Sequence, residues 1–329
     1  MIEMLHAPLI TSSIVAVAEL GIADMVADGP LPVAELAELV GADPDALYRV
    51  LRALASVGVF QETRPGVFGA TPLTDVLRSG VDGSLRNWAR LWGLRERHDA
   101  IGGLLASIRT GAPAFEIRRG ETWWSHLTAN PDQAAVFGAA MGDIARELHA
   151  AAVRGYDLSG VRCLVDVGGG EGHLAAVLLR RYPAMSAVVF DRPAVTSAAE
   201  ATLAEAGLSD RAVAVGGDFF ASVPAGGDVY LLSMILHDWN DEQAHAILTA
   251  VRRVLPPHGR VLVIDAVVPD DDSPHDGKLR DLIMLALHPG RERTEAEFTA
   301  LLADAGLRRV ETRAISASTG LLVAVPASR

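Results

Sequence analysis

The chain has 329 residues, enough for about two domains of roughly 150 residues each. Half of the residues are apolar, which excludes a disordered chain, and 41 acidic residues against 29 basic ones give a net charge of −12. That charge disfavours binding to nucleic acid or to an anionic membrane surface. The single cysteine, Cys163, excludes an internal disulfide. No basic residue precedes Arg49 and no uninterrupted apolar run is long enough for a membrane span, so we expect a soluble cytoplasmic protein.

Residues 1–154 have helical periodicity and predict a mainly helical domain. Within it, Pro32–Leu39 and Pro44–Val57 are predicted helices, and Gly58–Glu62 with Val67–Ala70 is a predicted β-wing. A helix-turn-helix with a wing is a DNA-binding shape. Residues 30–80, however, hold six acidic residues and four arginines, so the sequence favours an interaction or dimerisation role over DNA binding.

The N-terminal residues carry more apolar surface than one small domain can bury. The segments Leu5–Ile10 and Ile14–Ala18 are the clearest examples. We therefore expect residues 1–154 to mediate formation of a homodimer.

Residues 155–329 alternate short apolar runs with helical segments such as His173–Arg181, Asp241–Leu255 and Glu295–Ala305. Alternation of this kind predicts an α/β domain with a mostly parallel sheet covered on both faces. The predicted strands are Val161–Val167, Ser186–Phe190, Ala212–Val215, Asp228–Ser233, Arg260–Val268, Arg308–Arg313 and Gly320–Val325.

A glycine-rich loop follows the first of these strands and allows two interpretations. Gly170 to Ala175 fits the dinucleotide pattern G-x-G-x-x-A, with Asp191 as a ribose ligand 21 residues after Gly170. Asp166 to Gly172 fits D-x-G-x-G-x-G, the loop that resembles motif I of S-adenosylmethionine (SAM) methyltransferases. A carboxylate at Asp166 suits a cationic ligand and would repel a pyrophosphate, which favours SAM over NAD.

A second polar cluster, His237-Asp238-Trp239, follows the strand Asp228–Ser233 and precedes a helix capped by Asn240. A metal site formed by His237, Asp241 and His245 is an alternative use of this cluster. We do not expect a metal, because His237 precedes the helix that carries the other two residues.

Four blocks of the sequence together resemble one family, the SAM-dependent small-molecule O-methyltransferases of plant caffeate and flavonoid type and of bacterial polyketide tailoring. These blocks are Asp166–Gly172, Gly217–Phe220, Leu236–Glu242 and Gly290–Phe298. The resemblance implies a Rossmann-like class I methyltransferase domain with a seven-stranded sheet, preceded by a winged-helix-like dimerisation domain. It also implies SAM as cofactor and S-adenosylhomocysteine (SAH) as product.

The resemblance also implies roles for single residues. Gly168 and Gly170 would contact the methionine part of SAM, and Asp191 would hold its ribose. The full predicted cofactor set is Asp166, Gly168, Gly170, Asp191, Arg192, Asp218, Phe219, Ser233 and Trp239. Two members depart from the family pattern, since Ser233 replaces a frequent lysine and Arg192 replaces a frequent apolar residue.

His237 matches the general base of the family, Glu292 matches the carboxylate that orients it, and Asp238 is a third expected catalytic residue. The acceptor would be a hydroxylated small molecule, and no metal would be required. The predicted acceptor-binding residues are Trp123, Phe137, Met141, Met284 and His288. Alternatives are a SAM-binding relative with hydroxylase, decarboxylase or pericyclase chemistry, an NAD-dependent dehydrogenase, and a winged-helix regulator. The second glutamate that plant enzymes carry near the C-terminal strand is absent from Leu321–Ala324.

Overall fold

The computed structural model describes residues 1–144, 151 and 156–327. The chain divides into two compact units. The first comprises Met1–His98 and Pro131–Asp143, and the second comprises Asp99–Asn130 and Ile144–Arg329. The predicted boundary between residues 154 and 155 lies outside the described residues. The segment Asp99–Asn130 is compact with the second unit, although the sequence placed it in the N-terminal domain.

The first unit contains the predicted helix-turn-helix with its wing. Asp43 caps α4 by accepting a hydrogen bond of 2.8 Å from the backbone N–H of Ala46, and Pro44 occupies the first helical position. The strands form a small antiparallel sheet in the order β1-β3-β2. These elements are α3 (Val33–Val40), α4 (Pro44–Ser56), β1 (Leu31–Pro32), β2 (Phe60–Arg64) and β3 (Val67–Ala70).

The first unit contains further helices. They are α1 (Ile2–Leu20), α2 (Ile22–Met25), α5 (Pro72–Asp75), α6 (Arg86–Trp92) and α11 (Pro131–Ile144), while α7 (Arg95–Gly102) crosses from the first unit into the second. The C-terminal end of α1 is buried through Val17 and Ala18, whereas its N-terminal half exposes large apolar side chains. By length and composition α1 could cross a membrane, a test that a packed helix of a soluble protein also passes.

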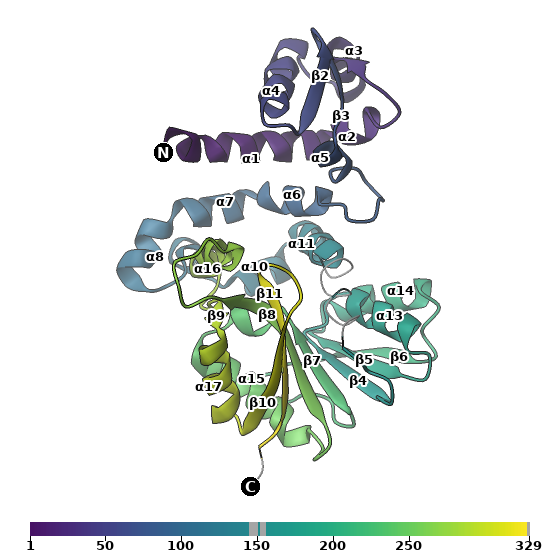
Figure 1. Cartoon of the computed structure of the whole chain (residues 1–329), viewed down its shortest axis with the longest axis vertical. Coiled ribbons are helices and arrows are strands. Elements are labelled where there is room, and N and C mark those ends of the chain that lie inside the picture. The colour runs from purple at the N-terminus through teal and green to yellow at the C-terminus, as the bar shows by residue number, and fades with distance from the viewer. Residues whose placement is uncertain (145–150, 152–155, 328–329) are drawn as a thin grey trace. The chain divides into compact units, whose positions relative to one another are not determined.

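The second unit is built on a twisted sheet in the order β10-β11-β8-β7-β4-β5-β6, with the short β9 paired to β8 (Figure 1). β11 is antiparallel to both of its neighbours, and the neighbouring strands from β8 to β6 pair in parallel. The strands are β4 (Cys163–Val167), β5 (Ser186–Asp191), β6 (Ala212–Gly216), β7 (Val229–Ser233), β8 (Arg260–Val268), β9 (Arg293–Thr294), β10 (Leu307–Ala314) and β11 (Thr319–Pro326). The predicted seven-stranded, mostly parallel sheet is confirmed.

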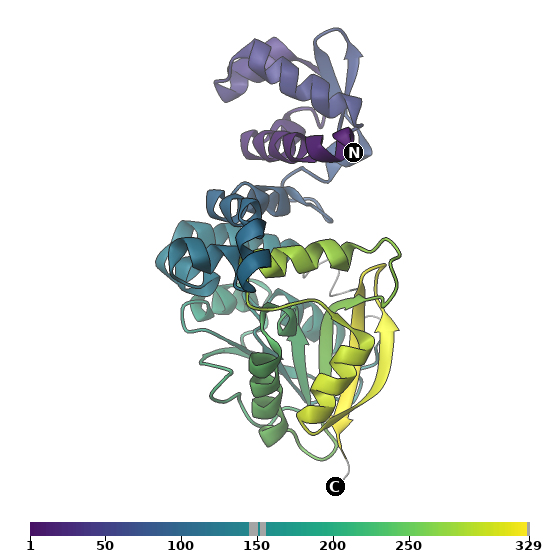
Figure 2. The ribbon, with the colours of Figure 1, turned by 90° about the vertical axis from the view of Figure 1, so that its left-hand side faces the viewer.

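Successive strand residues point to opposite faces of this sheet, and both sets are apolar. Helices therefore cover both faces. Leu164 packs with α13 and α14 in one core, and Val165 packs with α15 and α17 in the other. α15 and α17 lie side by side on their face (Figure 2). The helices of this unit are α8 (Leu104–Thr110), α9 (Ala114–Arg119), α10 (Trp123–Ala129), α13 (His173–Arg181), α14 (Thr196–Glu205), α15 (Asp241–Val254), α16 (Asp276–Leu287) and α17 (Glu295–Asp304).

The strand order brings two loops together at the carboxyl ends of the central strands. From β4 the chain proceeds to β5 and β6 on one side, and then crosses to β7 on the other side. Ligands of open α/β sheets bind at such a reversal, outside the carboxyl ends of the strands. The loops that follow β4 and β7, which hold the glycine motif and His237, are therefore neighbours.

We expect the exposed apolar surface of α1 to be buried against a second copy of the chain. Light scattering of the full-length protein should give twice 34.7 kDa. Replacing both Leu5 and Leu9 with Glu should shift the protein towards monomer, because these side chains are 71% and 65% exposed in the single chain.

Leu39→Glu is the matched control, since Leu39 is a 60% exposed leucine on α3 of the same unit. A wild-type protein that is monomeric at micromolar concentration, or that sediments with membranes, would contradict the dimer.

Candidate active site

The glycine loop after β4 forms an open backbone turn. Gly168, Gly170 and Gly172 have φ angles of 74°, 55° and 78°, which L side chains rarely adopt. A Cβ atom on Gly168 would lie 2.3 Å from Ile235 Cδ1, so glycine there allows the loop after β7 to approach closely. The backbone N–H of Gly170 donates to Asp191 Oδ2 at 2.8 Å. The turn thus joins the ends of β4, β5 and β7.

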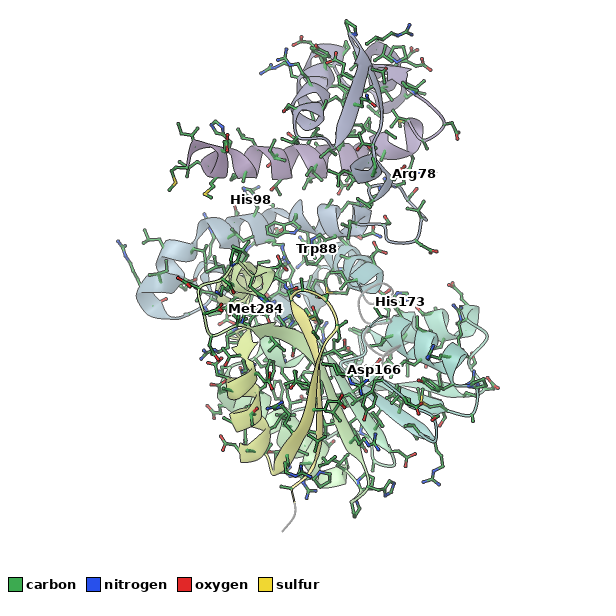
Figure 3. All side chains as sticks on the ribbon, viewed as in Figure 1. Arg78, Trp88, His98, Asp166, His173 and Met284 are labelled. Atoms are coloured by element: carbon green, nitrogen blue, oxygen red, sulfur yellow. The ribbon has the colours of Figure 1, made fainter. Side chains whose placement is uncertain are left out.

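Asp166 is a buried carboxyl group immediately beneath this turn. It is 1% exposed, and its Oδ2 has no hydrogen-bond partner among the described residues. Burial, followed by the charge of Asp191, raises the pKa of Asp166 to about 7. Figure 3 labels Asp166 on β4 and His173 at the start of α13, on either side of the loop. An unpaired buried carboxylate beside open backbone fits the positively charged part of a ligand.

Asp191 and Arg192 follow β5 and have different surroundings. The carboxylate of Asp191 faces the glycine loop through Gly170. The Arg192 guanidinium instead reaches α10, where Nη1 donates at 3.2 Å to the carbonyl of Trp124 and at 3.2 Å to Thr128 Oγ1. It also lies 5.1 Å from the centre of the Trp124 ring, a cation–π distance. Arg192 therefore ties α10 to the end of β5, and its contact with the cofactor stays a prediction.

The other predicted cofactor residues follow β6 and β7. Phe219 and Trp239 pack edge to face with ring centres 5.9 Å apart, and Phe220, which sequence analysis did not single out, completes the aromatic group. Asp218 Oδ1 accepts a hydrogen bond of 2.9 Å from the backbone N–H of Phe220. Ser233 is the last residue of β7.

The strongest polar cluster surrounds His237 on the short 3-10 helix Leu236–Asp238. His237 Nδ1 lies 3.0 Å from Glu292 Oε1 and 3.7 Å from Asp265 Oδ1. Its other nitrogen, Nε2, lies 3.6 Å from Asp238 Oδ1, and the same oxygen lies 3.7 Å from His288 Nε2. All five side chains are at least nine-tenths buried. The structure thus brings the predicted catalytic residues together and adds Asp265.

Two loops are held against each other to form this cluster. Arg293, 1% exposed, donates at 2.8 Å to the carbonyls of both Leu236 and Trp239, one on each side of His237 and Asp238. A Cβ atom on Gly290 would lie 1.9 Å from the carbonyl oxygen of His237, so only glycine permits this approach. Met234, with a φ of 56°, turns the chain from β7 into the 3-10 helix.

The surrounding carboxyl groups change the pKa of His237. Burial opposes the charged imidazolium, but Glu292, Asp238 and Asp265 outweigh burial and raise the pKa of His237 to about 10. Burial raises the pKa of Asp238 and that of Asp265 to about 7 each, against the lowering effect of His237. The pKa of His237 in the free protein is therefore well above the value of about 6.5 that is usual for histidine.

The metal alternative proposed from sequence does not form a cluster. Asp241 accepts from the guanidinium of Arg293, and His245 Nε2 lies 3.2 Å from the carbonyl of Asp304. Within residues 1–144, 151 and 156–327, the group with metal-ligand geometry is instead His237, Asp265 and Glu292, whose ligand atoms lie within 4.8 Å of one another.

The predicted acceptor residues have varied positions. His288 ends α16 and packs against Trp124 with ring centres 5.3 Å apart, and Met284 is buried on the same helix (Figure 3). Trp123 is buried between Phe115 and His126 in an aromatic core. Trp124, its neighbour, is thus the tryptophan beside His288. Phe137 and Met141 lie on α11 of the first unit. An acceptor role for each of these residues stays a prediction.

Comparisons with known proteins identify the family of the chain. Residues 2–80 match the O-methyltransferase dimerisation domain, and residues 102–308 match the O-methyltransferase domain. The phenazine O-methyltransferase PhzM of Lysobacter antibioticus is 43% identical over 306 residues, covering 93% of this chain and 89% of that protein. The aclacinomycin 10-hydroxylase RdmB of Streptomyces purpurascens is 36% identical over 310 residues, covering 92% and 82%.

Solved structures are similar over nearly the whole chain. The crystal structure of LaPhzM has a TM-score of 0.93 and 41% identity, covering 99% of this chain and 98% of that one. The O-methyltransferase NcsB1 from neocarzinostatin biosynthesis, in complex with SAH and 1,4-dihydroxy-2-naphthoic acid, has a TM-score of 0.81 and 35% identity, covering 96% and 95%.

We expect Asp166→Asn to stabilise the free protein at alkaline pH. Between its ordinary pKa of 3.8 and about 7, the Asp166 carboxyl keeps its proton in the folded state but loses it in the unfolded state. The wild type therefore loses stability as pH rises through this window, and the variant does not. The melting temperature of the variant should exceed that of the wild type by about 4 °C or more at pH 8, with little difference near pH 4.

Asp157→Asn, at an exposed aspartate, is the control and should show no such gain. A variant that melts below the wild type at pH 8 would contradict the assigned electrostatic cost.

Proposed function

The chain belongs to the O-methyltransferase family, and we propose that it transfers the methyl group of SAM to a hydroxyl group of a small aromatic or polyketide-like natural product. The observation that carries the proposal is the buried pair of His237 and Glu292, with His237 on the loop that approaches the glycine loop. A base at this edge of the sheet can reach a hydroxyl presented to the cofactor.

The residues around the glycine loop fit SAM. Asp166 has an unpaired buried oxygen for the ligand's cationic end, and a Cβ atom on Gly170 would meet no atom within 4 Å, so this turn is open to a ligand. Asp191 at the end of β5 would hold the ribose hydroxyls, and Phe219 and Trp239 would flank the adenine. When bound, SAM supplies an electrophilic methyl group on a sulfonium that is already a good leaving group.

The chain's own residues then have two tasks, which are to orient the acceptor and to take its proton. The Nδ1–H of His237 donates to Glu292, which leaves Nε2 as the nitrogen that accepts the proton of the acceptor hydroxyl. The oxygen keeps the electron pair of the broken O–H bond and becomes the stronger nucleophile. Glu292 stabilises the imidazolium that forms. Asp238, 3.6 Å from Nε2, lies on the acceptor side of the ring.

A second candidate function is SAM-dependent chemistry without methyl transfer, as the 10-hydroxylase relative suggests. Retention of His237 with its carboxylate partner favours methyl transfer here. An NAD-dependent dehydrogenase is excluded by membership of the O-methyltransferase family. The acidic winged-helix motif fits a dimerisation domain better than a regulator that binds DNA.

We expect His237→Ala to lower the turnover number by about 10²- to 10⁴-fold, the usual contribution of a positioned base, while SAH affinity stays unchanged. Glu292→Gln should lower turnover less, because it keeps the shape of the carboxylate and loses its charge. Calorimetry with SAH and a methylation assay on a panel of phenols measure the two effects.

His258→Ala is the matched control, since His258 is an exposed histidine of the same unit with 67% of its side chain accessible. Full turnover in His237→Ala would contradict the assignment of His237 as the base. SAH binding by the wild type without methylation of any hydroxyl would favour the second candidate function.

The turnover of the wild type should rise with pH well beyond 7. Only neutral imidazole accepts a proton, and the carboxyl groups around His237 raise its pKa to about 10 in the free protein. A profile that is already flat above pH 7 would show that the bound state releases the imidazole proton at lower pH.

Asp191→Ala should weaken SAH binding by about 1–3 kcal/mol, because it leaves two ribose hydroxyls without their acceptor. Calorimetry measures this loss directly. Asp218→Ala is a useful comparison at the adenine end, where Asp218 also holds the backbone N–H of Phe220. Binding of NAD with no response to SAH would contradict the cofactor assignment.

Metal independence is part of the proposal. Dialysis against EDTA should leave turnover unchanged, with added Mg²⁺ as the control. Loss of turnover that a divalent cation restores would indicate that His237, Asp265 and Glu292 hold a metal ion.

A further inference from the structure

Arg192 directly follows β5, and its side-chain contacts lead away from the carboxylate beside it. Its Nε stays 3.8 Å from Asp191 Oδ1. Its Nη1 instead donates at 3.2 Å to the carbonyl of Trp124 and at 3.2 Å to Thr128 Oγ1. The guanidinium carbon also lies 5.1 Å from the centre of the Trp124 ring. These three contacts are all with α10, so the side chain joins that helix to the end of β5.

The helix α10 is short and depends on contacts with the rest of its unit. It has seven residues, fewer than an isolated helix needs to be stable in water. One side of α10 is anchored by Trp123, whose buried ring meets Phe115 edge to face with ring centres 5.3 Å apart. Trp124 points about 100° further round the helix and is therefore held by different neighbours. Arg192 is one of them.

Trp124 leads to the side of the base where the acceptor would bind. Its ring packs against His288 with ring centres 5.3 Å apart, and His288 is 5% exposed. His288 Nε2 lies 3.7 Å from Asp238 Oδ1, and the same oxygen lies 3.6 Å from Nε2 of His237. That nitrogen is the one that takes the acceptor's proton in the proposed function. A shift of the Trp124 ring would therefore change the packing beside the base.

We propose that Arg192 is a positioning residue for the acceptor, and that it holds the Trp124 ring against His288. The inference rests on the proposed function for the identity of the base. Hydrogen bonds from the guanidinium fix the helix, and its flat face fixes the indole ring by cation–π contact. The apolar residue that is frequent at this position in the family has neither a donor nor a charge. Arg192 thus acts on the acceptor side of the site through α10, and the binding of SAM does not depend on it.

The first experiment follows the Trp124 ring by ¹⁹F NMR in full-length protein labelled with 5-fluorotryptophan. The chain has five tryptophans, and the loss of one signal in Trp124→Phe assigns its resonance. In Arg192→Leu this resonance should move towards its position in the unfolded protein, while the Trp239 resonance stays in place. Because 37% of the Arg192 side chain is exposed, the variant should fold.

Kinetics then separate an effect on the acceptor from an effect on the cofactor. The phenol that the wild type methylates fastest is the probe, and its KM should rise about five- to tenfold in Arg192→Leu, the range for one lost hydrogen bond. The turnover number at saturating phenol should stay the same, because His237 and Glu292 are unchanged. SAH affinity measured by calorimetry should also stay the same, because Asp191 is retained.

Arg180→Leu is the matched control, because Arg180 is an exposed arginine on α13 of the same unit. It should change neither the Trp124 resonance nor the KM for the phenol. Arg192→Lys keeps the charge and a donor but loses the planar fork of the guanidinium. Its Trp124 resonance and KM should therefore lie between those of the wild type and those of Arg192→Leu.

An unchanged Trp124 resonance in Arg192→Leu would overturn the proposal. A loss of SAH affinity with an unchanged KM for the phenol would assign Arg192 to the cofactor and would also reject it. Values for Arg192→Lys no nearer to the wild type than those for Arg192→Leu would contradict the role of the charge. The NMR measurement needs neither acceptor nor cofactor, so a failure of methyl transfer in the wild type is distinguishable from a failure of this inference.

Discussion

One buried imidazole surrounded by carboxyl groups is the constraint on which the active site depends. Three acids in a dry interior would repel one another strongly, and the positive charge of His237 is what makes their proximity tolerable. The same arrangement makes the imidazole a strong base. The same set of charges therefore stabilises the site and makes His237 basic. Neither the loop of His237 nor the loop of Glu292 could move far without leaving a buried charge uncompensated.

The sheet supplies the framework for that cluster. The reversal of strand order between β4 and β7 brings the glycine turn next to the loop of His237. Asp265, on the neighbouring strand β8, lies close to the imidazole of His237. Arg293 then fixes the backbone on both sides of the base. Each contribution comes from a different strand or loop, so the fold and the site are specified together.

The sequence predicts the elements of this fold well and the partners of its side chains less well. Strands such as Arg260–Val268 and Ser186–Asp191 can be predicted from their apolar runs alone, because strands buried on both faces require apolar residues. His237 and Glu292 were found because their motifs resemble a family. Asp265 was missed, although an aspartate inside an otherwise apolar strand is a visible signal. Trp124 and the shifted pKa of His237 depend on segments distant in sequence, which no local pattern encodes.

The close approach of Gly290 to the carbonyl of His237 has a consequence for how the enzyme reaches its working state. The two residues are 53 positions apart in the chain, and their backbones meet without an intervening side chain. Closing a chain segment of this length costs conformational entropy, which only the completed fold offsets. Catalytic competence therefore requires two distant pieces of backbone to be in place together. Local opening of either piece would remove activity while the sheet and its helices stay folded.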